Sequence, residues 1–106
     1  MELDVVTINN MKADLLLHER MVLNEKAFAD LVVWRVPRAV PGSAHPYKYR
    51  LAYVISSKCL IRFDNEAGKG DHCHLGEDEV AYEFESLEKL LEDFWRLVDK
   101  LRGSEP

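Results

Sequence analysis

The sequence predicts an α+β domain, in which a meandering antiparallel sheet of about five strands carries a C-terminal helix on one face. Two observations indicate this class. Segments with an apolar–polar period of two, separated by short turn-forming stretches, fill most of the chain. Segment 86–103 has the period of a helix instead. The length of 106 residues allows one domain with one core. We expect this domain at 11–103, after an N-terminal extension at 1–10 and before a tail at 104–106.

The first two predicted strands are 12–23 and 27–36. Segment 12–23 is short and is followed by the break Asn-Glu-Lys-Ala, which favours a strand, although its Leu, Met and Ala residues also suit a helix. Segment 27–36 is rich in β-branched and apolar residues and stops at Pro37. Segment 37–46 holds three prolines, a glycine and a serine, so we expect a loop there.

The clearest strand is 47–55, and we expect 59–64 to return beside it after a tight connection. By the period of two, Tyr47, Tyr49, Leu51, Tyr53 and Ile55 share one face, and Lys48, Arg50, Ala52 and Val54 share the other. In the partner strand, Cys59, Ile61 and Phe63 share one face, and Leu60, Arg62 and Asp64 share the other. We therefore expect the tyrosine row in the core, and Arg50 near Arg62.

A short strand at 79–84 and the helix at 86–103 complete the domain. Ser86 suits a helix N-cap, Glu88 suits the positive end of the helix dipole, and Gly103 is a plausible stop. An apolar stripe at helical spacing should cover one side of the sheet; it consists of Leu87, Leu90, Leu91, Phe94, Leu97, Val98 and Leu101. The second face, with Trp34 as one candidate, leaves room for a homodimer or a different partner.

Composition and charge restrict the function. No apolar run reaches the ~18 residues of a membrane helix, residues 1–10 show no signal-peptide pattern, and two cysteines make no disulfide framework, so we expect a cytoplasmic protein that does not enter membranes. The net charge of −5 argues against broad nucleic-acid binding. Segment 35–76, however, carries +4 and three of the four histidines. This asymmetry favours a confined site for a phosphate ligand.

The stretch "FDNEAGKGDHCHLG" at 63–76 holds the strongest candidates for chemistry. In an extended chain His72 and His74 project to the same side, and both can transfer protons near neutral pH. A cation would stabilise charge on a phosphate, and a carboxylate would orient a histidine. Together these groups are the parts of metal-independent RNA cleavage. We predict catalytic roles for His72, His74, Lys69 and Asp71, and substrate binding by Arg50, Arg62, Asp64, Asn65 and Tyr49; Asp64 is also an alternative orienting carboxylate.

Several alternatives remain open at this stage. The glycine-rich stretch is also typical of a solvated turn, and Arg50 and Arg62 could simply pair with Asp64 or Glu79. The run of residues 71–74, Asp-His-Cys-His, contains good zinc ligands, but no second cluster supplies further ones, so we expect no metal or other cofactor and keep metal-dependent hydrolysis as an alternative. A third alternative is a non-catalytic module, whose acidic C-terminal third, net −6 over 77–100, suits a basic protein partner.

Four segments occur in a characteristic order between Met11 and Arg102: "KADLLLHERMVL", "VVWRVPRAVPGSAHPYKYRLAYV", "IRFDNEAGKGDHCHLG" and "SLEKLLEDFW". Over this range the chain resembles the TumE-type toxins of type II toxin–antitoxin systems. The resemblance implies a small toxin encoded beside a DNA-binding antitoxin, and toxins of this size are often ribonucleases acting on RNA. It supplies no catalytic residues, so the site assignments rest on the residues above.

Overall fold

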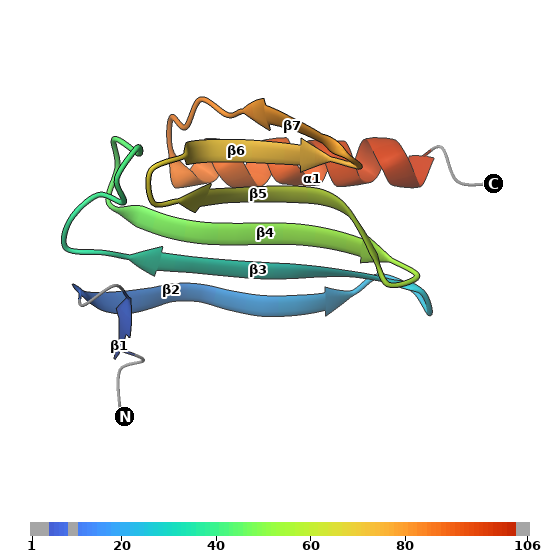
Figure 1. Cartoon of the computed structure of the whole chain (residues 1–106). Coiled ribbons are helices and arrows are strands. Elements are labelled where there is room, and N and C mark those ends of the chain that lie inside the picture. The colour runs from blue at the N-terminus through green and yellow to red at the C-terminus, as the bar shows by residue number, and fades with distance from the viewer. Residues whose placement is uncertain (1–4, 9–10, 104–106) are drawn as a thin grey trace.

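The computed structural model describes residues 5–8 and 11–103, which form one antiparallel sheet and one helix (Figure 1). The α+β class is confirmed, but the sheet has seven strands rather than about five. Residues from the predicted extension add one strand, and the stretch 63–76 adds another. The elements are β1 (Val5–Ile8), β2 (Met11–Val22), β3 (Ala27–Arg35), β4 (Tyr47–Ile55), β5 (Lys58–Glu66), β6 (Gly70–Leu75), β7 (Asp78–Ala81) and α1 (Leu87–Gly103).

The sheet is a simple meander. Each strand pairs antiparallel with the next one in the chain, so the spatial order is the sequence order. Short turns suffice for such pairing. Helix α1 lies along the β5 and β6 end of the sheet on one side only, and no helix or strand among the described residues covers the opposite side (Figure 1). Among the described residues, no helix is both long enough and apolar enough to cross a membrane.

The core lies between the sheet and α1. Tyr49 and Tyr53 of β4 are fully buried there, which confirms the prediction for the tyrosine row at these positions. Three residues at four-residue spacing in the helix, Leu90, Phe94 and Val98, are fully buried against them. The helix begins as predicted, because Ser86 Oγ accepts a hydrogen bond of 3.1 Å from the Lys89 amide.

One predicted face assignment is wrong because β5 contains a bulge. Tyr53 pairs with Ile61, but the next residue, Val54, pairs with Cys59, so the register shifts by one residue. Leu60 therefore packs against the core, and Cys59 is exposed. Beyond the bulge the predicted alternation holds: Ile61 and Phe63 are buried in the core.

Candidate functional site

The stretch 63–76 is a hairpin rather than a loop, and its alternation divides the predicted site residues between two faces. Strand β5 continues to Glu66, and β6 starts at Gly70. His72 and His74 lie on the uncovered face of the sheet, opposite Asp64 and Arg62. The residues between them in sequence point to the helix face, where Cys73 belongs to the core.

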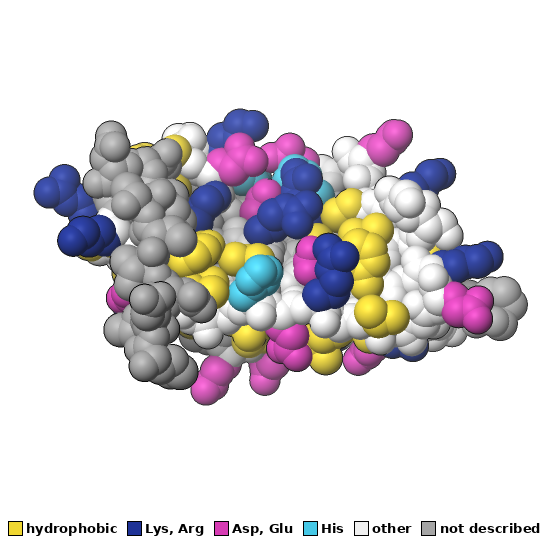
Figure 2. Space-filling view, turned by 90° about the horizontal axis from the view of Figure 1, so that it is seen from below, with side chains coloured by type: hydrophobic (Ala, Val, Ile, Leu, Met, Phe, Trp, Pro, Cys, Tyr) yellow, Lys and Arg dark blue, Asp and Glu magenta, His cyan; other side chains and the backbone are white. Residues whose placement is uncertain are grey.

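The cross-strand pairing arranges the uncovered face in two parallel rows of side chains, because paired residues share a face. Both rows run from β2 to β7. The first row is His18, Val32, Arg50, Asp64, His72 and Ala81, and the second row is Arg20, Asp30, Ala52, Arg62, His74 and Glu79. In the view from below in Figure 2, which is turned by 90° from Figure 1, basic, acidic and histidine side chains are interspersed over the described surface rather than gathered by sign. Because of these rows, side chains from β4, β5, β6 and β7 lie next to one another on the uncovered face.

Arg62, Asp64 and His74 form the tightest group on this face. The Asp64 carboxylate is nearly buried, with 9% of its side chain exposed, and its Oδ2 lies 3.1 Å from Arg62 Nε. The Arg62 Nε–H is buried but does not point at the carboxylate with hydrogen-bond geometry. The two side chains therefore interact as an ion pair without a hydrogen bond through Nε. Arg62 Nη2 lies 3.1 Å from His74 Nε2. A guanidinium only donates, so Nε2 must be the acceptor and the neutral ring carries its proton on Nδ1.

Glu79 joins the two histidines from the edge strand β7. Its Oε1 lies 3.6 Å from His72 Nε2, and its Oε2 lies 4.0 Å from His74 Nδ1. The ring centroids of the histidines are 6.4 Å apart. The sequence suggested Glu79 only as a partner of an arginine. Its role beside the histidines depends on the β6–β7 register, which pairs His74 with Glu79. We refer to Arg62, Asp64, His72, His74 and Glu79 as the histidine cluster.

A groove of about 410 Å³ opens beside this cluster and shares two residues with it. The exposed Arg50 lies in it and makes no hydrogen bond or ion pair with any residue that the structure describes. Although Arg50 pairs in register with Asp64, the carboxylate contacts Arg62 instead. The residues that line this Trp34 groove are Val32, Trp34, Lys48, Tyr49, Arg50, Arg62, Asp64 and Glu66.

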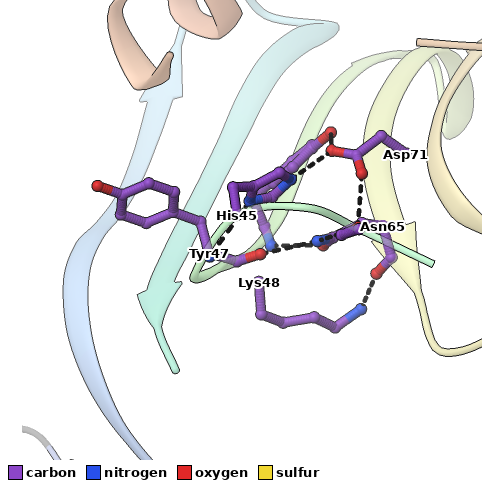
Figure 3. Close-up of polar contacts among 7 residues, drawn as sticks. His45, Tyr47, Lys48, Asn65 and Asp71 are labelled. Carbon is purple, nitrogen blue, oxygen red and sulfur yellow. Dashed lines mark hydrogen bonds and ion pairs between the residues drawn. The ribbon is translucent and has the colours of Figure 1, made fainter. Parts of the chain in front are cut away.

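Asp71 lies on the opposite side of the sheet and is fully engaged there (Figure 3). Its Oδ1 accepts a hydrogen bond of 2.5 Å from Ser43 Oγ. Its Oδ2 accepts one of 2.6 Å from the Tyr49 hydroxyl and lies 2.7 Å from His45 Nε2. Asp71 therefore fastens the 37–46 loop to β6 and is not placed to orient His72 or His74.

Asn65 completes this arrangement, which we call the loop staple (Ser43, His45, Tyr49, Asn65 and Asp71). Its amide is fully buried: Oδ1 accepts from the Tyr49 amide at 3.0 Å, and Nδ2 donates to Ser43 Oγ at 3.2 Å and to the Tyr47 carbonyl at 2.7 Å. Ser43 and His45 both bind Asp71, so the three do not form the nucleophile–base–acid order of a catalytic triad.

The electrostatics of the loop staple favour neutral donors. Burial raises the pKa of Tyr49 far above its ordinary value, and the hydrogen bond to Asp71 raises it further. Tyr49 is thus a proton donor to Asp71 at any physiological pH. Since Nδ1 of His45 accepts from the Tyr47 amide at 3.2 Å, the proton of the neutral ring is on Nε2, facing Asp71. His45 stacks on Phe84 with centroids 3.7 Å apart.

Lys69 is also separate from the histidines. It is exposed at the β5–β6 turn, where its Nζ lies 3.8 Å from Glu66 Oε2. It lines another hollow on the side of Asp71 and Phe84. Of the predicted site residues, the structure thus brings together His72, His74, Arg62 and Asp64, with Arg50 in the adjoining groove. The other four, Lys69, Asp71, Asn65 and Tyr49, lie outside the histidine cluster, although Tyr49 also contributes to the lining of the groove.

The Asp-His-Cys-His run does not converge as a metal-ligand set. Alternation along β6 sends Asp71 and Cys73 to the helix face and the two histidines to the other. Within 5–8 and 11–103, no three His, Cys, Asp or Glu side chains lie close enough together to hold a metal ion. The motif that suggested a metal in the sequence is therefore divided by the sheet itself.

A sheet covered on one side, with ionisable side chains on its uncovered side, defines a small α+β domain whose open face is its distinctive surface. A family model described as Toxin TumE matches residues 11–102, from β2 through nearly all of α1. The chain belongs to the TumE toxin family, as the sequence resemblance indicated. Membership implies a toxin role with a cognate antitoxin as partner. No curated protein and no solved structure is significantly similar to the chain.

Proposed function

We propose that the chain is a toxin that cleaves RNA without a metal ion, using the histidine cluster. The observation that carries the proposal is the meeting of two histidines with a guanidinium and two carboxylates on the open face. The rival carboxylate, Asp71, is engaged on the other face. Cleavage of RNA by its own 2′-hydroxyl needs one group that accepts a proton, one that donates a proton and a cation for the phosphate.

The contacts within the cluster support one division of these roles among its residues. His74 is neutral at Nε2, and a phosphate that draws the Arg62 guanidinium to itself frees that nitrogen to accept the 2′-hydroxyl proton. The 2′-oxygen attacks phosphorus, and Arg62 stabilises the charge on the phosphorane. His72, whose Nε2 lies 3.6 Å from the Glu79 carboxylate, is the group that donates a proton to the departing 5′-oxygen. The products are a 2′,3′-cyclic phosphate and a 5′-hydroxyl.

The test is cleavage of a mixed RNA substrate by the purified chain in EDTA. We expect His72→Ala and His74→Ala each to lower the rate by 10²-fold or more, as is typical for removal of a general acid or base. His18→Ala is the matched control, because His18 is exposed on the same face but lies outside the cluster. Cleavage that survives both cluster substitutions would remove the histidines from the mechanism.

The remaining outcomes identify the alternatives. Cleavage that is lost in EDTA and restored by a divalent ion would indicate metal-dependent hydrolysis. A stable complex with the neighbouring antitoxin, without turnover of any RNA by the free toxin, would indicate a non-catalytic interaction module. A complex alone decides nothing about catalysis, because a toxin binds its antitoxin whether or not it is an enzyme; the RNA assay is therefore run with the free chain.

A further inference from the structure

We infer that the Trp34 groove is a binding site for unpaired RNA, in which Trp34 stacks a nucleobase and Arg50 holds a phosphate. The inference rests on the proposed function, because it names the form of substrate that the histidine cluster receives. Its starting observation is that Arg62 and Asp64 belong both to the groove and to the cluster. A chain lying in the groove therefore reaches the histidines without crossing another surface.

Trp34 has the features of a stacking platform. It is partly buried, because it packs against a small apolar group formed by Ala13, Val36 and Val40. The same side chain also lines the groove. A ring supported in this way is held in place before a ligand arrives, so stacking a base costs little conformational entropy. Aromatic platforms of this type bind single strands with little sequence preference, since every base has a π-face.

The charges around the ring suit a phosphate chain better than a free base. Lys48 is the direct cross-strand neighbour of Trp34, and Arg50 follows two residues later on the same face of β4. The Lys48 amine already donates to the Asn65 carbonyl, whereas Arg50 makes no hydrogen bond or ion pair in the described part of the chain and interacts only through its charge with Asp30. Arg50 is thus the groove cation that is available to a ligand without breaking an internal contact.

The spacing favours a short oligonucleotide over a single nucleotide. Trp34 and His72 are separated by three strand spacings and two residues along the strand, or ~16 Å. A base on Trp34 therefore belongs to a nucleotide beyond the one that is cut. A duplex keeps its bases stacked on each other and cannot offer one to the ring, so the groove should select unpaired RNA.

The experiment measures binding of a 2′-O-methyl oligonucleotide of about eight nucleotides, which cannot be cleaved because the 2′-hydroxyl is blocked. In a Trp95→Phe background Trp34 is the one remaining tryptophan, and we expect its fluorescence to be quenched on binding. Trp34→Leu keeps the apolar packing and should weaken binding about tenfold or more, whereas Trp34→Phe should keep most of it. A matched duplex should bind more weakly than the single strand.

Arg50→Gln is the second variant, since this exposed side chain makes no hydrogen bond or ion pair in the described structure, and losing its charge near Asp30 should leave the fold intact. We expect weaker binding and a salt dependence reduced by about one phosphate contact. Arg20→Gln is the control, because Arg20 is exposed on the same face but pairs with Asp30 outside the groove.

The outcomes separate this inference from the proposed function. If RNA is cleaved but Trp34→Leu and Arg50→Gln bind the oligonucleotide like the unaltered chain, the groove assignment is overturned and the nuclease stands. If the oligonucleotide binds through Trp34 and Arg50 but no RNA is cleaved, the groove stands and the nuclease falls. If the chain neither binds nor cleaves, both are wrong.

Discussion

Arg62 and His74 face each other across β5 and β6, and Nη2 of the arginine lies 3.1 Å from Nε2 of the histidine. The contact ties the protonation of the ring to the position of the guanidinium. Because Arg62 can only donate, His74 must be neutral at Nε2 for as long as the contact holds. A ligand that displaces Arg62 changes what His74 can accept.

The first prediction concerns this tautomer. In the resting protein the neutral ring of His74 should carry its proton on Nδ1, as nitrogen chemical shifts of labelled histidine report. Arg62→Gln removes the charge and should let the proton populate Nε2, where Asp64 Oδ1 lies 3.6 Å away. His18 supplies the internal control and should not change. If the His74 ring carried its proton on Nε2 in the unaltered protein, Arg62 could not donate a hydrogen bond to that nitrogen, and the prediction would be wrong.

The second prediction concerns the stability supplied by Asp64. Asp64→Asn leaves the partly buried Arg62 without its counter-charge, and we expect a loss of about 1–3 kcal/mol in the free energy of unfolding. Urea denaturation at neutral pH measures it. Asp30→Asn is the matched control: Asp30 pairs with Arg20, whose side chain is 60% exposed, so the loss should be smaller. Equal losses would mean that burial of Asp64 adds nothing.

The third prediction separates the loop staple from catalysis. Asn65→Ala leaves the Tyr49 amide and the Tyr47 carbonyl without their side-chain partner, so we expect a loss of about 2 kcal/mol or more in stability. Asp71→Asn should also destabilise, because three donors converge on the carboxylate. Where the Asp71→Asn variant remains folded, its pH–rate profile for RNA cleavage should keep the shape of the unaltered chain. A displaced profile would return Asp71 to the active site.

The fold was largely predictable from the sequence because its strongest signals are local. The period of two in 47–55 identified β4 and its buried tyrosines, and the stripe with its Ser86 cap identified α1. The bulge at Leu60 was not predictable, because one extra residue in a strand leaves no distinctive signal in the types of residue that the strand contains. The glycines and charges of 63–76 also resembled a loop, although they form a turn between two paired strands.

The site was predictable only in part, because its geometry depends on register. The two histidines share a face by alternation alone, and this expectation agrees with the structure. Adjacent residues such as Asp71 and His72 looked like partners in sequence, but a strand sends neighbours to opposite faces. Glu79 comes close to the histidines only through the β6–β7 pairing. Neighbours in sequence within β6 therefore do not share the site, and the residues that do share it are those paired across strands.

The fourth prediction concerns the two cysteines. Burial raises the pKa of Cys73 to about 11, with the charge of Asp93 adding to the effect, whereas Cys59 is exposed just before the bulge in β5. At pH 8 roughly one Cys73 thiol in a thousand is a thiolate. A thiol reagent such as iodoacetamide should modify Cys59 and leave Cys73 unmodified until urea unfolds the chain. Cys59→Ser should remove the reaction of the folded protein, and rapid labelling of that variant would contradict the buried position of Cys73.

The fifth prediction concerns acid stability at the junction of α1 with the segment that precedes it. Burial raises the pKa of Asp93, but hydrogen bonds from Lys89, Tyr82 and Arg96 outweigh it, and the net shift is downward. The folded-state pKa is therefore below that of the unfolded chain. The stabilisation is fully present above the ordinary carboxyl pKa of about 3.9, and it is lost as the pH falls through the folded-state value.

The measurement is the urea midpoint between pH 7 and pH 3. Asp93→Asn should lower the midpoint at pH 7, where the carboxylate holds its three donors. The difference between variant and unaltered chain should shrink towards pH 3, because protonation removes the same charge from the unaltered protein. Asp99→Asn, an exposed position on the same helix, is the control and should show no such convergence. A gap that stays constant with pH would show that Asp93 stabilises the junction by packing alone, with no contribution from its charge.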